Sequence, residues 1–182
     1  MNYYFVKIAL RSVSPMVWRR LRIPGNASLA MLHECIQIIN GWDDENLHRF
    51  HIYGKDYGIN YIGAVCYSDD ANAIYLDDFD FDVGDKFIYE YNFFGHIIHD
   101  IRIEKINKSL TNDNSIVCLK GSGMPGATKY DEMKLNHKFL KTMVAKKGKL
   151  TEKDVIYFRE RLNRIKFNIN QTNTILASIY IK

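Results

Sequence analysis

Large apolar side chains fall on every second position in several stretches of this chain, and this period of two predicts β-strands. Residues 3–12 and 17–23 form the first pair, and the Ser14–Pro15 turn between them makes that pair a hairpin. Residues 47–53 predict a third strand and residues 74–76 a short one. Residues 87–93 and 97–106, joined by Phe94 and Gly95, predict a second hairpin.

One helix is expected between the first hairpin and the third strand. Ser28 precedes it as an N-cap, apolar residues recur at helical spacing as far as Ile39, and Gly41 stands where a glycine ends a helix. Residues 134–146 and 151–165 predict two further helices, and the β-branched residues 174–181 predict a terminal strand. Residues 54–72 and 107–131 are rich in glycine and polar residues and predict loops.

This order of elements predicts an α+β fold. We expect a β-grasp-like mixed sheet, ββαβ and then a β-hairpin, crossed by one helix and followed by a C-terminal helical extension. Residues 1–131 would form the β-grasp-like domain. Residues 132–182 would form a C-terminal helical lobe with the terminal strand, packed on the same core.

Composition narrows the class of protein. A hydrophobic content of 47% and an aromatic content of 13% exclude a disordered chain. The three cysteines are far apart in the sequence, which argues against a disulfide framework and for a reducing interior. The N-terminal apolar run carries charge, unlike a signal peptide, and no stretch reaches the length of a membrane span. We therefore expect a cytoplasmic protein with no membrane partner.

Charge is unevenly spread, although the net charge is only +4. Seven aspartates and no Lys or Arg fall between residues 69 and 85, whereas residues 132–166 carry eleven Lys or Arg against four acids. Two interpretations stay open. The charged faces either attract each other weakly across the fold, or a basic C-terminal lobe meets an anionic partner.

Three blocks of sequence resemble one family. Residues 4–58 contain "SPMVWRRLRIP", "LAMLHECIQIINGW" and "LHRFHIYG", residues 84–106 read "GDKFIYEYNFFGHIIHDIRIEKI", and residues 118–123 read "CLKGSG". Together they resemble the Ri-plasmid open-reading-frame-three-like family, whose members occur on plasmids, in archaeal genomes and with insertion elements. The resemblance implies an α+β, β-grasp-like fold over residues 3–125 and brings no settled activity with it.

The second block departs from the family pattern. Where the family has an aspartate, a glycine, an acidic pair and a tryptophan, this chain has Asn92, Phe94, Gly95, His96 and Ile97. The family's histidine is kept as His99. If members of the family use a carboxylate site, the resemblance implies that this chain has lost it.

His99 is the candidate catalytic residue, on a strand face otherwise built from isoleucines. His96 and His99 point to opposite faces of a straight strand, as do His48 and His51, so neither pair can hold one ion. A metal site would need ligands from separate elements, such as His48 or His51 with His99 and Asp43. Zinc accepts these ligand types, but their spacing gives no sign of a site, so we predict no metal and no cofactor.

The stretch "VWRRLRI" supplies the candidate binding residues, Trp18, Arg19, Arg20 and Arg22. Arginines interleaved with an aromatic ring can hold phosphates and stack on a base. The alternative is an edge strand protected by its charges, with Trp18 in the core.

Three functions follow from these residues. The first is a non-catalytic binding module, carried by a plasmid or mobile element, with nucleic acid or another protein as its partner. The second is a metal-assisted hydrolase-like enzyme that uses His99 with His48 or His51. The third is a structural or oligomeric component. The sequence does not indicate an oligomeric state.

Overall fold

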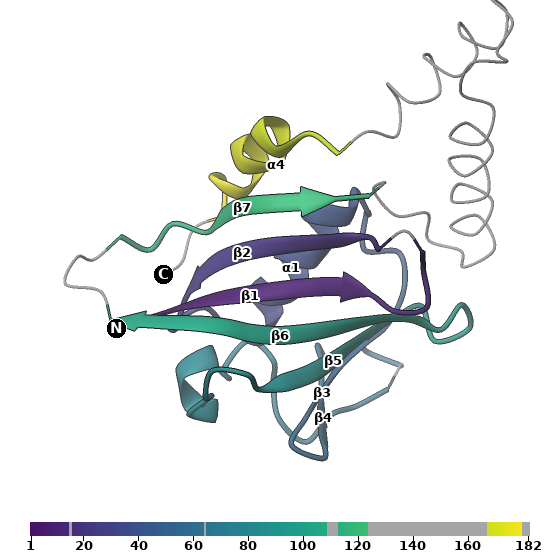
Figure 1. Ribbon diagram of the computed structural model, residues 1–182. Helices are drawn as coiled ribbons and strands as arrows, with labels where there is room; N and C mark the ends of the chain where they lie inside the picture. The colour runs from purple at the N-terminus through teal and green to yellow at the C-terminus, as the bar shows by residue number, and fades with distance from the viewer. Residues whose placement is uncertain (15, 64, 109–112, 124–166, 180–182) are drawn as a thin grey trace, which may run out of the picture.

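The computed structural model describes residues 1–14, 16–63, 65–108, 113–123 and 167–179 (Figure 1). Its centre is a seven-stranded sheet in the order β4-β3-β5-β6-β1-β2-β7. The strands are β1 (Asn2–Leu10), β2 (Trp18–Pro24), β3 (His48–Ile52), β4 (Lys55–Tyr57), β5 (Lys86–Tyr91), β6 (Ile97–Lys108) and β7 (Val117–Ser122). These strands pair only antiparallel, so the α+β class is confirmed, the expected mixed sheet is wrong, and a β-grasp-like arrangement is not confirmed.

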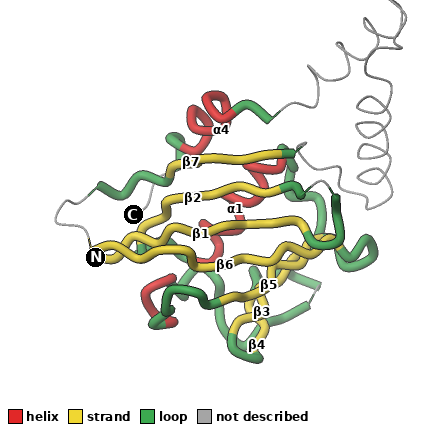
Figure 2. The backbone as a smooth tube through the Cα atoms, in the orientation of Figure 1, coloured by secondary structure: helices red, strands yellow, loops and turns green. Residues whose placement is uncertain are grey.

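The helix α1 (Leu29–Asn40) lies behind the sheet and covers one of its faces (Figure 2). The Ser28 hydroxyl accepts a hydrogen bond from the backbone N–H of Met31 at 3.1 Å, which satisfies one of the free donors of the first turn. Gly41 adopts φ 68°, the left-handed conformation that ends a helix. Both ends of the predicted helix are therefore confirmed.

Strand alternation gives the sheet two different faces. Buried and more exposed residues alternate along most of β1, β2 and β6, as the apolar pattern predicted. The buried residues pack with α1 in one hydrophobic core. No described helix lies over the other face, which Figure 1 shows towards the viewer across β1, β2 and β6. We call this second side of the sheet the open face.

Two strands lie where loops were predicted. Tyr53 and Gly54 have φ values of 48° and 80°, two positive angles that suit a tight hairpin turn, and the chain returns from this turn as β4. The strand β7 contains Gly121 and Ser122, residues that weaken strand propensity, but it pairs with β2 along five residues. Tertiary pairing therefore overrides the loop pattern of the sequence.

Two other predictions are wrong in the type of element. Of the short strand predicted over residues 74–76, only Tyr75 forms an isolated β-bridge, with Ser28, and the 3₁₀ turn η1 (Leu76–Phe79) follows it. The terminal strand predicted over residues 174–181 begins within the helix α4 (Ile169–Leu176). Asn168 caps α4, and the side chain of Asn173 forms hydrogen bonds with both backbone groups of Cys118 in β7. These tertiary contacts stabilise a helix in a β-branched sequence.

The helices predicted over residues 134–146 and 151–165 lie outside the described residues, as does the boundary between residues 131 and 132. The division into two domains therefore stays a prediction. Within the described part of the chain, no helix combines the length and apolar character needed to cross a membrane.

Candidate functional site

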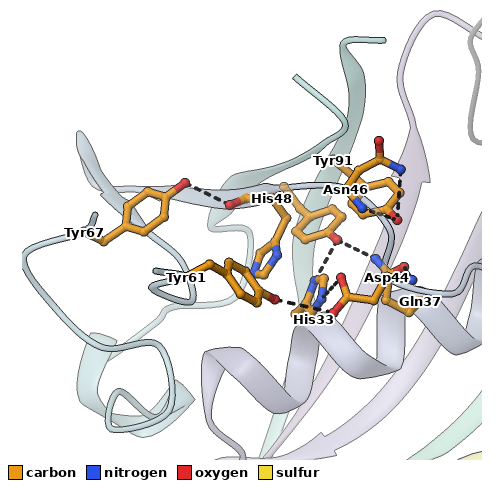
Figure 3. A network of polar contacts seen from close by, with 9 residues as sticks. His33, Gln37, Asp44, Asn46, His48, Tyr61, Tyr67 and Tyr91 are labelled. Atoms are coloured by element: carbon orange, nitrogen blue, oxygen red, sulfur yellow. Dashed lines mark hydrogen bonds and ion pairs between the residues drawn. The ribbon is translucent and has the colours of Figure 1, made fainter. Parts of the chain in front are cut away.

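A network of polar side chains joins α1, the loop after it and β5 (Figure 3). The ring of His33 lies between two partners: Nδ1 is 2.9 Å from the Tyr89 hydroxyl, and Nε2 is 2.9 Å from Asp44 Oδ1. Gln37 Nε2 donates to the same Tyr89 hydroxyl at 2.9 Å, and Gln37 Oε1 accepts from the Asp44 N–H at 3.2 Å. The orientation of His33 is therefore fixed from both sides.

The local sequence explains why these groups meet. His33 and Gln37 are four residues apart on α1, so both point from the same side of the helix towards the sheet. The left-handed Gly41 ends the helix and lets the next residues turn back, which brings Asp44 alongside the helix. The alternation of β3 turns His48 inwards, together with Phe50 and Ile52.

His48 stacks on His33, with ring centres 3.5 Å apart and planes 12° apart. Its side chain is buried, and neither ring nitrogen has a hydrogen-bond partner among the described residues. The backbone carbonyl of His48 accepts a hydrogen bond from the Tyr67 hydroxyl at 2.9 Å. This bond holds the backbone of His48 in place but leaves its ring without a hydrogen bond among the described residues. A buried, unpaired imidazole of this kind calls for a chemical explanation.

Burial controls the charge of both rings. It lowers the pKa of His33 to about 4. Burial, reinforced by His33 and opposed by Asp44, lowers the pKa of His48 to about 3. Burial also raises the pKa of Asp44, against the opposing effect of His48. Both imidazoles are therefore neutral near pH 7, which is the form of histidine that binds metals.

The structure does not bring together the metal ligands suggested by the sequence. His48 lies on the helix-covered face, whereas His51 lies on the open face, where its Nδ1 is 2.6 Å from Asp56 Oδ1. Asp43 is exposed and belongs to no candidate metal cluster among the described residues. His99 is buried beside Tyr89, with ring centres 5.9 Å apart, and also lies outside such a cluster.

Sequence reasoning missed His33 and Asp44. Local spacing gave no sign of them, because His33 shares no helix face with the nearby Cys35, and its polar partner Asp44 comes from the loop beyond Gly41. The cluster His33, Asp44 and His48 is assembled by tertiary packing alone.

The four candidate binding residues of β2 divide between the two faces. Arg19 is only 2% exposed, and its guanidinium donates to the carbonyl oxygens of Trp18 at 2.8 Å and Ser122 at 2.7 Å. The same group lies 3.8 Å from the centre of the Phe167 ring. Burial lowers the pKa of Arg19 to about 10, so it still carries its charge inside the fold. Arg19 therefore contributes to the core, whereas Trp18, Arg20 and Arg22 lie on the open face.

Five basic residues form one row across the open face. Lys7 in β1 stands opposite Arg20 in β2 and Arg102 in β6. Arg20 in turn stands opposite Lys120 in β7, and Arg102 opposite Lys86 in β5. Because directly opposed residues share a face, all five side chains emerge on the same side of the sheet. We call these residues the cation row.

One acid interrupts the positive charge of the cation row. Glu104 accepts hydrogen bonds from Arg20 Nε at 2.5 Å and Arg20 Nη2 at 3.1 Å. These hydrogen bonds lower the pKa of Glu104, and the charges of Arg20, Lys7 and Arg102 lower it further. The lowered pKa of Glu104 indicates that the electrostatic potential around the cation row is positive.

Two aromatic rings flank the cation row. Trp18 lies on one side, with Lys7 Nζ and the Arg20 guanidinium each 5.3 Å from its ring centre. Phe5 lies on the other side, with Lys105 Nζ 5.5 Å from its ring centre. Both rings are half-buried, so part of each remains open to solvent.

A solved structure from another organism has a similar fold. The structure is similar to the crystal structure of MM3350, a protein of unknown function from Methanosarcina mazei Go1, with a TM-score of 0.67 and 21% sequence identity over 93% of this chain and 96% of that chain. At this identity the likeness concerns the fold alone.

Comparison of the sequences identifies the family. The chain is 32% identical over 101 residues to the uncharacterised protein y4hQ of Sinorhizobium fredii, a match that covers 55% of this chain and 52% of that protein. The chain thus spans about half the length of that relative. The family of plasmid pRiA4b ORF-3-like proteins matches residues 2–171, which confirms the resemblance found in the sequence. The chain belongs to the plasmid pRiA4b ORF-3-like protein family.

Proposed function

We propose that this chain is a non-catalytic module that binds single-stranded nucleic acid on the open face of its sheet. The observation that carries the proposal is the cation row, which crosses five neighbouring strands. Strands in a sheet lie about 4.8 Å apart, so five of them spread the charges over about 19 Å. A charged backbone laid across the strands would contact several of these cations at once.

The cation row is unfavourable for the isolated fold. Like charges directly opposite each other in a sheet destabilise it, by an amount of the order of 0.2–1 kcal/mol for each pair. The cation row contains four pairs of directly opposed cations. Among the described residues, Glu104 forms an ion pair with one of the five cations, Arg20. An anionic partner would offset this repulsion, which favours a binding role for the row.

The aromatic rings favour nucleic acid over an acidic protein. A base stacked on an exposed aromatic ring contributes about 1–3 kcal/mol whatever its identity. Trp18 and Phe5 flank the row on which phosphates would lie, so bases could reach a ring on either side. An acidic polypeptide would use the charges but would gain little from the rings.

Fluorescence anisotropy of a labelled single-stranded oligonucleotide, measured over a salt series, tests the proposal. Each phosphate neutralised contributes about −0.7 to the slope of log K against log salt, so five contacts predict a slope of about −3.5. The double variant Lys7→Gln/Arg102→Gln is expected to bind more weakly at low salt, with a slope shallower by about 1.4. Trp18→Ala is expected to weaken binding without changing the slope.

The matched control is Arg11→Gln/Lys55→Gln, which removes the same two residue types away from the cation row. Arg11 pairs with Asp100, and Lys55, on the edge strand β4, pairs with Asp69. Equal losses in the two double variants, or no binding at low salt, would refute the proposal. If the loss instead follows neutralisation of the lysines in residues 132–166, the sheet is not the site. If polyglutamate binds as tightly as the oligonucleotide, and Trp18→Ala does not weaken its binding, the partner is a protein instead.

A further inference from the structure

We propose that His33, Asp44 and His48 bind a transition-metal ion such as zinc. One donor atom of each residue lies within 4.8 Å of the other two. Two imidazoles and a carboxylate are zinc ligands in proteins, and three protein ligands leave the fourth position of a tetrahedral ion open. This site lies on the helix-covered face, so it does not depend on nucleic-acid binding at the open face.

His48 provides the observation that points to a ligand. Its side chain is 1% exposed, and both ring nitrogens lack a hydrogen-bond partner in the described part of the chain. Leaving such nitrogens unpaired inside a protein is unfavourable. Coordination through one nitrogen would supply the missing partner.

His33 is already held as a ligand would be. Metal-bound histidines usually form a hydrogen bond through the nitrogen that does not bind the metal. Here the Tyr89 hydroxyl, itself bonded to Gln37, fixes Nδ1 and leaves Nε2 directed at Asp44. The Asp44 side chain is 41% exposed, which opens a path for an ion from solvent to this otherwise buried pair.

The stacked rings show which part of the site must move. Zinc lies about 2.0–2.1 Å from a histidine nitrogen, close to the plane of its ring. Two stacked rings with centres 3.5 Å apart and planes at 12° cannot both contain one ion in their planes. The His33 ring is fixed by two hydrogen bonds and the His48 ring by none, so metal binding turns His48 out of the stack.

Metal binding at this site requires a proton to move within His33. The 2.9 Å contact between His33 Nε2 and Asp44 Oδ1 requires a proton between them, on one atom or the other. On a neutral His33 this proton is carried by Nε2, so a metal ion that binds Nε2 requires the proton to move to Nδ1, which then donates it to the Tyr89 hydroxyl oxygen.

The test is titration of chelator-treated full-length protein with Zn²⁺, and with Co²⁺ followed by visible absorption. We expect one ion for each chain. Asp44→Asn and His48→Gln should each weaken binding by about 100-fold or more, and Tyr89→Phe by about 10-fold through loss of the bond that orients His33. Asp44→Asn changes a partly exposed residue and decides the question if His48→Gln does not fold.

The chain offers a matched control. His51 and Asp56 form an exposed histidine–carboxylate pair, with Nδ1 and Oδ1 2.6 Å apart, on the other face of the sheet. The variant His51→Gln/Asp56→Asn should bind zinc as tightly as the parent protein. Absence of binding by the parent protein, or an equal loss in this control, would overturn the proposed site.

Discussion

His99 should make the stability of the fold depend on pH above the range in which carboxylates titrate. Its ring is 2% exposed, and neither nitrogen has a hydrogen-bond partner among the described residues. Burial, together with the charge of Arg19 and against that of Asp100, lowers the pKa of His99 to about 3. In the unfolded chain the same group titrates near its ordinary pKa of about 6.5. The unfolded state therefore takes up a proton first as the pH falls, and the contribution of His99 to stability, complete above the unfolded pKa, is lost as pH falls towards the folded pKa.

The magnitude can be worked out for two convenient conditions. Between about pH 7 and about pH 5 a folded His99 stays neutral while an unfolded one becomes almost fully charged, which lowers the free energy of unfolding by about 2 kcal/mol. Urea denaturation of the parent protein and of His99→Leu, at both pH values and with a chelator present, measures this change. The variant should lose about 2 kcal/mol less than the parent protein over this range.

The comparison of the parent protein with His99→Leu decides this prediction. An unchanged pH dependence in His99→Leu would refute the reasoning, because it would mean that His99 is protonated to the same extent in the folded and unfolded states. The comparison uses differences between two pH values, so any change in packing caused by leucine cancels.

Three further substitutions test individual parts of the fold by urea denaturation. Arg19→Met should lower the free energy of unfolding by about 3 kcal/mol or more, because buried carbonyl oxygens lose their donor, whereas Arg20→Met breaks a surface pair with Glu104 and should change it by about 1 kcal/mol or less. Lys7→Gln should raise stability by a few tenths of a kcal/mol, since it relieves repulsion from two opposed cations, while it weakens oligonucleotide binding in the anisotropy assay. Ser28→Ala should lower stability by about 1 kcal/mol through loss of the N-cap.

Position along a strand already contained the correct assignment of Arg19. Residues 17, 19, 21 and 23 share one side of β2, and three of these four are apolar, so alternation places Arg19 inside with them. The nearby Arg20 and Arg22 drew attention to its charge instead. The sequence did not indicate the hydrogen-bond partners of Arg19. One of them, Ser122, belongs to β7, whose Gly and Ser residues predicted a loop.

The ends of α1 could be predicted because their causes are local. A serine hydroxyl caps the first turn and a left-handed glycine ends the last, and both effects act within a few residues of chain. The helix α4 has a local N-cap at Asn168, but its β-branched residues favour a strand and its position also depends on Asn173 bonding to Cys118. The same limit applies to His33, Asp44 and His48, which only the packing of α1 against β3 brings together.

The two candidate sites share a property that a purely structural role does not explain. In the cation row, four like-charge neighbours lower the stability of the sheet. In the histidine cluster, an imidazole is buried with both nitrogens unpaired. Neutral side chains in the cation row, and an apolar side chain in place of His48, would give a more stable fold. The surrounding sheet and helix nevertheless follow the ordinary rules of alternation and capping. Such departures are typical of positions where a sequence is constrained by something other than stability, and these two lie on opposite faces of one sheet. Binding at one face therefore need not disturb the other.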